Sequence, residues 1–193
     1  MRQKIMIVAG EASGDIHGAK LAESLYAQAN PIELFGIGGK QMRSAGVRIE
    51  VDAHRLAVVG ITEVLAKLPQ ILDGMRTAKR LVADEKLDLL ILIDFPDFNL
   101  HLAAFAKKHA IAVLYYISPQ IWAWRPGRVR KIKRLVDHMA VILPFEPPFY
   151  QRHGVPVTYV GHPLADAAAI DSYQPPDPNR PELYTEAERV IRE

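Results

Sequence analysis

The sequence predicts a doubly wound α/β fold, in which helices cover both faces of a parallel β-sheet. Short apolar runs alternate with longer segments of helical period from Ile5 to Val160. The run Leu87–Asp94 is apolar at nearly every position, as expected of a parallel strand that is covered on both faces. The links between these segments are short, which favours right-handed strand–helix–strand units within one sheet.

The expected elements follow one another in regular alternation along the chain. Strands are expected at Ile5–Ala9, Leu34–Ile37, Leu87–Ile93, Ala112–Ile117, Met139–Leu143 and Val157–Val160. Helices are expected at 15–29, 61–83, 98–109, 125–136 and 145–153. Residues 1–166 should therefore form one domain. Four prolines in Tyr173–Pro181 predict an extended linker over 167–181, and the pattern of 182–193 predicts a short charged helix.

Composition excludes several classes of protein. The 193 residues are 49% hydrophobic, with 24 Lys and Arg against 22 Asp and Glu, and such a chain is not intrinsically disordered. There is no cysteine, which excludes disulfides and thiolate metal sites. No stretch approaches the ~20 apolar residues of a membrane span, so we expect a soluble or surface-bound chain. A net charge of +2 with no recognition motif argues against nucleic acid as a partner.

The first candidate site is the loop Gly10–Asp15, which follows the first predicted strand. Ligands of open parallel sheets bind at the carboxyl ends of the strands. The loop has neither the dinucleotide fingerprint nor the G-K-[ST] of a phosphate loop. A turn in which Ser13 or Asp15 caps the next helix explains those two residues but leaves the carboxylate of Glu11 unexplained. Taken alone, the loop supports a functional and a structural interpretation equally.

The second candidate site is the loop that begins at Asp94. This residue ends the most apolar run, so its carboxylate should lie at the rim of the sheet, partly removed from water. Burial, or a like charge such as Glu11 nearby, would raise its pKa toward that of a general base. We expect Asp97 to cap a helix that begins near Phe98. The D-x-x-D spacing favours a metal only weakly, and we predict neither a metal nor a cofactor.

The third candidate site is the segment Ser118–Arg125 with the basic helix after it. Arg125 and Arg128 are suited to a phosphate-type ligand, because a guanidinium group fits phosphate oxygens. His17 lies one turn into the first helix, within reach of a ligand in the first loop. His162 follows the last strand, at the place where a cleft is expected. No pair of histidines has the spacing of metal ligands.

A fourth feature is an apolar stripe along the helix expected at 61–83. The default interpretation of such a stripe is core packing. The alternative is a surface for acyl chains or a bilayer, where flanking cations such as Lys67 and Arg76 meet anionic head groups. Composition does not decide between the two. The stripe consists of Ile61, Val64, Leu65, Leu68, Ile71 and Leu72.

These segments together resemble one family. The matching segments are Val8–Asp15, Val59–Leu65, Ile93–Asn99, Tyr116–Arg125, Leu143–Glu146, Phe149–Tyr150 and Val160–Leu164. In this order and spacing they resemble the lipid-A-disaccharide synthases, which are bacterial inverting glycosyltransferases. The resemblance covers about residues 4–166.

The resemblance implies a GT-B fold, in which two Rossmann-like lobes face each other across a cleft. It implies transfer of 2,3-diacylglucosamine from its UDP derivative to 2,3-diacylglucosamine 1-phosphate, which forms a β-1,6 disaccharide. Asp94 would be the base for the acceptor 6-hydroxyl, and Glu11 a second essential carboxylate. The apolar helix would serve acyl chains and docking at the inner face of the bacterial inner membrane. The expected substrate-binding residues are Ser13, Asp15, His17, Asn99, Trp122, Arg125 and Arg128.

One departure from the family concerns length. Family members are about twice as long, their second lobe binds UDP, and residues 167–193 hold no second Rossmann unit. We therefore expect an acceptor-side lobe that binds an acyl-sugar phosphate and an anionic membrane, with the UDP-sugar site mostly elsewhere, and that is inactive alone. A homodimer is left open. The alternatives are another GT-B transferase, a UDP-sugar epimerase relative, or a non-catalytic lobe for membrane attachment.

Overall fold

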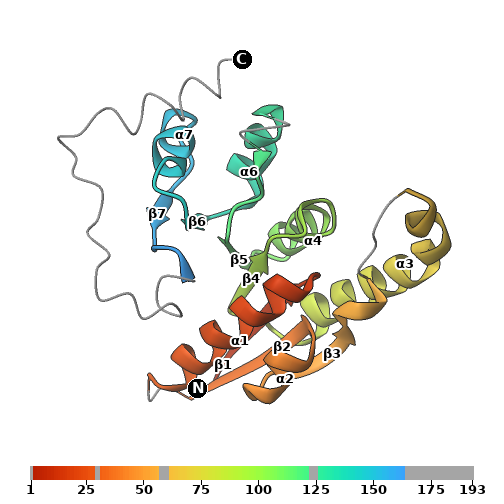
Figure 1. Ribbon diagram of the computed structural model, residues 1–193. Helices are drawn as coiled ribbons and strands as arrows, with labels where there is room; N and C mark the ends of the chain where they lie inside the picture. Colours follow the sequence, from red (N-terminus) through yellow and green to blue (C-terminus); the bar gives the residue numbers. More distant parts are fainter. Residues whose placement is uncertain (1, 29–30, 57–60, 122–125, 164–193) are drawn as a thin grey trace.

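One parallel sheet organises the molecule (Figure 1). The computed structural model describes residues 2–28, 31–56, 61–121 and 126–163, so the expected linker and terminal helix lie outside the described residues. The described strands run in the order β3-β2-β1-β4-β5-β6-β7, and all neighbours are parallel. They are β1 (Gln3–Ala9), β2 (Ile32–Gly38), β3 (Arg48–Asp52), β4 (Leu89–Ile93), β5 (Ala112–Tyr116), β6 (His138–Val141) and β7 (Val157–Tyr159). The predicted fold class is confirmed.

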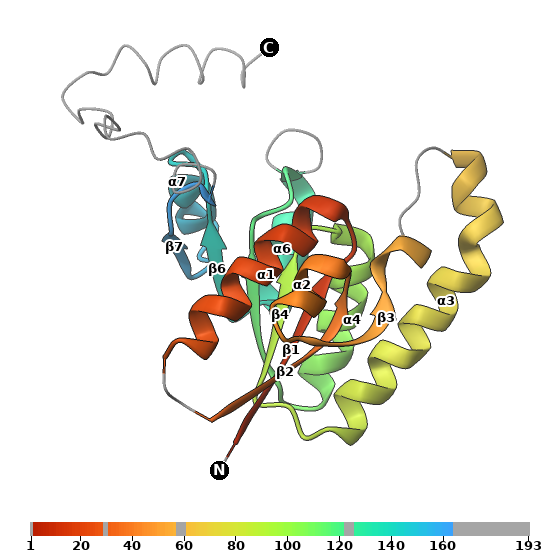
Figure 2. The ribbon, with the colours of Figure 1, turned by 60° about the horizontal axis from the view of Figure 1, so that its bottom comes forward.

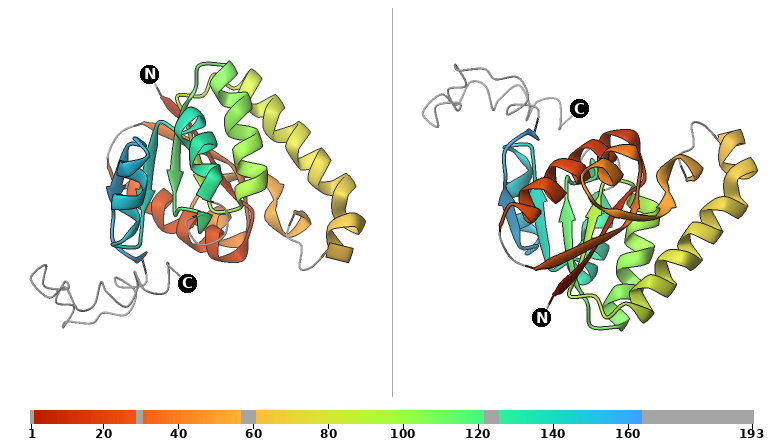
Figure 3. Two further views of the ribbon diagram at one scale, coloured as in Figure 1. Left: turned by 90° about the horizontal axis from the view of Figure 1, so that it is seen from above. Right: turned by 90° about the horizontal axis from the view of Figure 1, so that it is seen from below.

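Helices cover both faces of the sheet (Figure 3). The helices are α1 (Ala12–Tyr26), α2 (Lys40–Ser44), α3 (Ile61–Asp84), α4 (Pro96–Lys108), α6 (Val129–Leu135) and α7 (Glu146–Arg152), with 3-10 turns η1 (Ala53–Arg55) and η2 (Pro126–Arg128). Successive residues of β1 belong to two separate parts of the core, one on each face of the sheet, because strand side chains alternate between faces. Met6 belongs to the buried cluster that includes residues of α3, α4, α6 and α7, whereas Ile7 belongs to the cluster that includes residues of α1 and α2.

Two elements were not predicted, the edge strand β3 and the short helix α2. In β3, Arg48, Glu50 and Asp52 alternate with Ile49 and Val51, and no residue of this strand is buried. An edge strand needs only one apolar face, so a search for continuous apolar runs misses it. The helix α2 has five residues, which is too short for a helical period to be detected in the sequence.

Gly36 allows β1 and β2 to approach each other closely at the centre of the sheet. Its φ is +147°, a backbone conformation that residues with a Cβ atom rarely adopt. A Cβ atom placed there would lie 2.0 Å from the carbonyl oxygen of Ile7 in β1. The register of β2 against β3 also shifts between Gly36 and Ile37. The sheet therefore requires glycine at this position.

The longest helix, α3, has no counterpart of similar length elsewhere in the described part of the chain. It contains Pro69 and lies beside α4 on the outside of the sheet (Figure 2). Within the described ranges, neither α3 nor any other helix combines the length and the apolar character that crossing a membrane requires.

Candidate active site

The strand register brings Glu11 and Asp94 to the same edge of the sheet. Ala9, at the end of β1, pairs with Ile93, at the end of β4. The strand order reverses direction between these two strands, and doubly wound folds bind ligands at such a point. Glu11 follows β1 by two residues and Asp94 follows β4 by one. The structure thus places together the two carboxylates that the sequence proposed as a pair.

The environment of this edge raises the pKa of both carboxyl groups. Burial raises the pKa of Asp94, and a hydrogen bond from the backbone of Phe95 opposes that effect in part. Burial also raises the pKa of Glu11, and the nearby charge of Asp94 raises it further. These directions match the expectation of a partly desolvated rim carboxylate. A carboxylate with a raised pKa is a stronger base once it has lost its proton.

Asp94 and Phe95 adopt a strained backbone conformation that neighbouring side chains hold in place. Their φ angles are 44° and 47°, in the left-handed region that non-glycine residues rarely occupy. The hydroxyl of Tyr115 donates a 2.5 Å hydrogen bond to the carbonyl oxygen of Asp94. The amide of Asn99 donates to the same oxygen at 2.7 Å and to the carbonyl of Ile93 at 3.2 Å. These bonds fix the direction in which the Asp94 side chain leaves the strand.

Asn99 is not positioned to contact substrate, as we had expected from the sequence that it would be. Its side chain is 0% exposed, so it acts on the loop through the backbone carbonyls that it binds. Tyr115 was not among the predicted site residues. The sequence feature that could have identified Tyr115 is a tyrosine inside a buried strand, because a buried phenolic hydroxyl requires a hydrogen-bond partner.

The two loops also pack directly against each other through Gly10 and Phe95. A Cβ atom on Gly10 would lie 2.3 Å from Cδ1 of the Phe95 ring. Glycine therefore lets the ring lie against the backbone just before Glu11. The Phe95 ring in turn stacks on Phe98, with 5.2 Å between the ring centroids. This aromatic contact couples the position of the Glu11 loop to that of the Asp94 loop.

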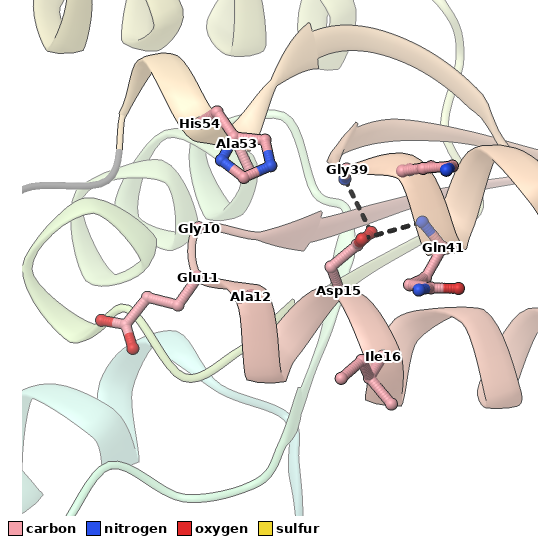
Figure 4. Close-up of a pocket in the computed structure, with 10 residues that line it drawn as sticks. Gly10, Glu11, Ala12, Asp15, Ile16, Gly39, Gln41, Ala53 and His54 are labelled. Atoms are coloured by element: carbon pink, nitrogen blue, oxygen red, sulfur yellow. Dashed lines mark hydrogen bonds between the residues drawn. The ribbon is translucent and has the colours of Figure 1, made fainter.

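Neither Ser13 nor Asp15 caps α1, which corrects the expectation from the sequence. Glu11 occupies the N-cap position of α1, and its side chain makes no capping hydrogen bond. The Asp15 carboxylate instead accepts hydrogen bonds from the backbone N–H groups at the start of α2, those of Gly39 (2.6 Å), Gln41 (2.9 Å) and Met42 (3.1 Å). Figure 4 shows this carboxylate directed at α2, whereas the Glu11 side chain extends away from it. Ser13 is exposed.

Asp97 likewise does not cap its helix. The helix α4 begins at Pro96, two residues earlier than predicted, and its N-cap residue is Phe95. Asp97 lies in the first turn and forms a 2.6 Å ion pair with Arg128. The Arg128 side chain is 21% exposed and is thereby held beside the Asp94 loop. Trp122 and Arg125 lie outside the described residues.

His17 and His162 lie near each other although 145 positions separate them in the sequence. Burial lowers the pKa of His17, and the charges of Lys20 and His162 lower it further. The ammonium group of Lys20 also lies 3.5 Å from the carbonyl oxygen of Pro163. The segment after β7 therefore lies near α1.

An apolar cavity of about 600 Å³ lies beside Glu11 and the residues that follow Asp94, between α3 and α4. Its lining includes Ile71, Leu72, Met75, Phe95, Phe98 and Glu11. Leu72 is 47% exposed and Leu68 is 44% exposed, whereas Ile71 packs against the core. The apolar stripe on α3 is therefore not sealed inside the protein. The side chains of Ile61, Val64 and Leu65 lie outside the described part.

Comparison with known proteins identifies the family. Residues 5–191 match the family model described as lipid-A-disaccharide synthetase. The chain belongs to this family. The match continues beyond Asp166, where we expected the resemblance to end. Lipid-A-disaccharide synthases of Geobacter metallireducens and Geobacter sulfurreducens are 57% and 58% identical over 164 and 163 residues, and that of Coxiella burnetii is 52% identical over 165.

The chain spans less than half the length of these relatives. The three alignments cover 85%, 84% and 86% of this chain but only 43%, 42% and 44% of the respective synthases. This coverage agrees with the N-terminal lobe of a lipid-A-disaccharide synthase, as expected from the resemblance.

Solved structures with the same fold have little sequence identity to this chain. A putative UDP-N-acetylglucosamine 2-epimerase from Listeria monocytogenes superposes with a TM-score of 0.63 at 13% identity, covering 91% of this chain and 50% of that one. The UDP-GlcNAc 2-epimerase from Neisseria meningitidis, bound to UDP-GlcNAc, gives 0.61 at 13%, covering 86% and 47%. These likenesses support the Rossmann-like lobe of a GT-B fold.

Proposed function

We propose that this chain is the acceptor-side half of a lipid-A-disaccharide synthase and supplies the catalytic base. The reaction joins UDP-2,3-diacylglucosamine to 2,3-diacylglucosamine 1-phosphate, forms a β-1,6 bond and releases UDP. The observation that carries the proposal is a pair of rim carboxylates with raised pKa values beside an apolar cavity. In this proposal the carboxylates interact with a sugar hydroxyl, and the cavity holds acyl chains. Membership of the family supports the same assignment.

Asp94 is the base in this proposal. Its carboxylate accepts the proton of the acceptor 6-hydroxyl as that oxygen attacks the anomeric carbon of the donor. The bond to UDP breaks on the opposite face of the sugar, so the configuration inverts. Partial burial makes the carboxylate basic, and the bonds from Tyr115 and Asn99 to its backbone hold it in a fixed direction. Glu11 hydrogen-bonds the acceptor hydroxyls at the same rim.

The donor contacts only part of this chain in the proposal. The departing diphosphate needs cations or helix N-termini near its oxygens. Among the residues that the structure describes, Arg128, which pairs with Asp97, is the candidate for this contact. Arg125 and Trp122 of the same segment are the others. Ser13 and His17 belong to the α1 side of the site. The Neisseria meningitidis epimerase shares the fold, and its structure was solved with UDP-GlcNAc bound. This supports a UDP-sugar donor.

Separate titrations with the acceptor and with UDP test the proposal. We expect the purified chain to bind 2,3-diacylglucosamine 1-phosphate in neutral detergent, measured by isothermal titration calorimetry. UDP should bind at least about tenfold more weakly, because most of its charged partners belong to the other half. Binding of UDP without binding of the acceptor would overturn the proposal, and so would binding of neither.

We also propose that the exposed end of the apolar stripe docks on an anionic membrane. Leu68 and Leu72 expose apolar surface, and Arg76 on the same helix is exposed and cationic. The variant Leu68→Asp/Leu72→Asp should lose most of its sedimentation with vesicles that contain phosphatidylglycerol, because it replaces apolar contact by repulsion. Tyr159→Asp/Val160→Asp, which alters two residues that are 41% and 50% exposed and adds the same charge, is the matched control. Equal sedimentation of both variants would contradict membrane docking through α3.

A further inference from the structure

Lys79 places a positive charge at an otherwise largely apolar part of the cavity between α3 and α4. The cavity lining includes Lys79 from α3 and His101 from α4, together with the apolar side chains described above. Glu11 and Asp97 line the same cavity. The cavity thus combines acidic groups, an apolar wall and two basic groups. An uncharged acyl chain would require only the wall.

The ammonium group of Lys79 has no carboxylate partner among the described residues. Its Nζ atom lies 5.6 Å from the ring centroid of Phe105, which attracts a cation but does not neutralise it. Lys79 forms none of the ion pairs found between described residues, whereas Lys4 and Lys107 each contact a carboxylate at 2.7 Å. A half-buried ammonium ion in this position gains most from an anion that enters the cavity.

The positions of these groups along the helices match an elongated ligand. The helices α3 and α4 lie side by side, and both begin at the edge of the sheet that carries Glu11 and Asp94 (Figure 2). From Leu72 to Lys79 the backbone of α3 advances about 10 Å, at about 1.5 Å per residue. The lysine therefore lies farther from this edge than the exposed leucines. His101 lies between the first turn of α4 and Phe105.

We propose that Lys79 binds the phosphate of the acyl-sugar acceptor. This inference rests on the proposed function and deepens it, because it assigns to one residue the preference for a phosphorylated over an unphosphorylated acceptor. The sugar hydroxyl faces Asp94, the phosphate faces Lys79, and the acyl chains leave past Leu68 and Leu72. A cavity of about 600 Å³ has the size of an ordinary small-molecule site and holds a sugar phosphate with the first part of an acyl chain.

A comparison of two ligands and three proteins tests this inference. The ligands are 2,3-diacylglucosamine 1-phosphate and 2,3-diacylglucosamine, each in neutral detergent. The proteins are the unmodified chain, Lys79→Gln and Arg80→Gln. The last is the matched control, because it removes a charge from the neighbouring, exposed position of the same helix. Isothermal titration calorimetry gives the ratio of the two affinities for each protein.

We expect the unmodified chain and Arg80→Gln to prefer the phosphorylated ligand by about tenfold or more. In Lys79→Gln this preference should fall to about twofold, while affinity for the unphosphorylated ligand stays the same. A preference that Lys79→Gln retains would overturn the inference and leave the proposed function intact. If the unmodified chain binds neither ligand, the proposed function itself fails. The two failures are therefore distinguishable.

A lipid head group is the other source of phosphate chemistry, and a vesicle experiment separates it from the acceptor. Sedimentation with phosphatidylglycerol vesicles should be the same for Lys79→Gln and Arg80→Gln, since each loses one positive charge. A selective loss of sedimentation in Lys79→Gln, with the acceptor preference retained, would assign this lysine to the membrane surface and overturn the inference.

Discussion

Replacing Asp94 by asparagine is expected to lower kcat by about 10²–10⁴-fold, the usual contribution of a general base. The measurement requires a complete enzyme, for example this chain fused to the remaining portion of the Geobacter metallireducens synthase, with UDP release as the readout. The acceptor KM should change little, because asparagine keeps the size and the hydrogen-bonding capacity of the side chain. Asp84→Asn, at the exposed end of α3, is the control and should retain full activity. Unchanged turnover in Asp94→Asn would assign this residue a structural role.

The same variant, Asp94→Asn, is expected to lower kcat but to raise the free energy of unfolding. The raised pKa of Asp94 means that the folded state holds its proton more tightly than the unfolded state does. The resulting stabilisation is complete below the ordinary pKa of 3.8 and is lost as pH rises through the folded value. Asp94→Asn never carries the charge, so it should be more stable than the unmodified chain at pH 8, with a smaller difference at pH 4. Urea unfolding of the chain at both pH values measures this. A variant less stable at pH 8 would contradict it.

Gly36→Ala is expected to destabilise the chain by more than about 4 kcal/mol or to prevent folding, among the largest effects of a single substitution. The added Cβ atom would lie 2.0 Å from the carbonyl oxygen of Ile7, and β1 cannot move away without losing its pairing with β4. The φ of +147° adds backbone strain. Far-UV circular dichroism and urea unfolding measure the loss.

Gly127→Ala is the matched control for this substitution. A Cβ atom at Gly127 would meet nothing within 4 Å, and its stability should change by less than about 1 kcal/mol. If Gly36→Ala unfolds at the same urea concentration as this control, the close approach of β1 and β2 is absent in solution.

Much of the fold follows from the sequence because the central strands are buried on both faces. The five residues of β4 and most of β1 are apolar throughout, and such runs have few alternatives. The edge strand β3 escaped detection for the opposite reason, since its charged residues face solvent. The proximity of Glu11 and Asp94 could also be predicted, because both follow predicted strands and the strands of such a sheet end at one edge.

The partners of polar side chains could not be predicted in this way. Asp15 lies next to the start of α1, and local sequence favours a cap for that helix, yet its three donors belong to α2. Asn99 and Tyr115 meet at the carbonyl oxygen of Asp94 only after β4 and β5 have paired. The position of Lys79 over Phe105 depends on how α3 packs beside α4. These contacts join elements far apart in the chain, and sequence spacing carries no record of them.

The crossover from β3 to β4 has a consequence for how such enzymes diverge. This connection contains α3, which forms one wall of the cavity but contributes neither of the two carboxylates. Under the proposed function, substitutions at Leu72 or Met75 would alter the preferred fatty-acid length and leave the two carboxylates in place. We expect related bacteria that make lipids of different length to vary most along this outer helix and least at the ends of β1 and β4.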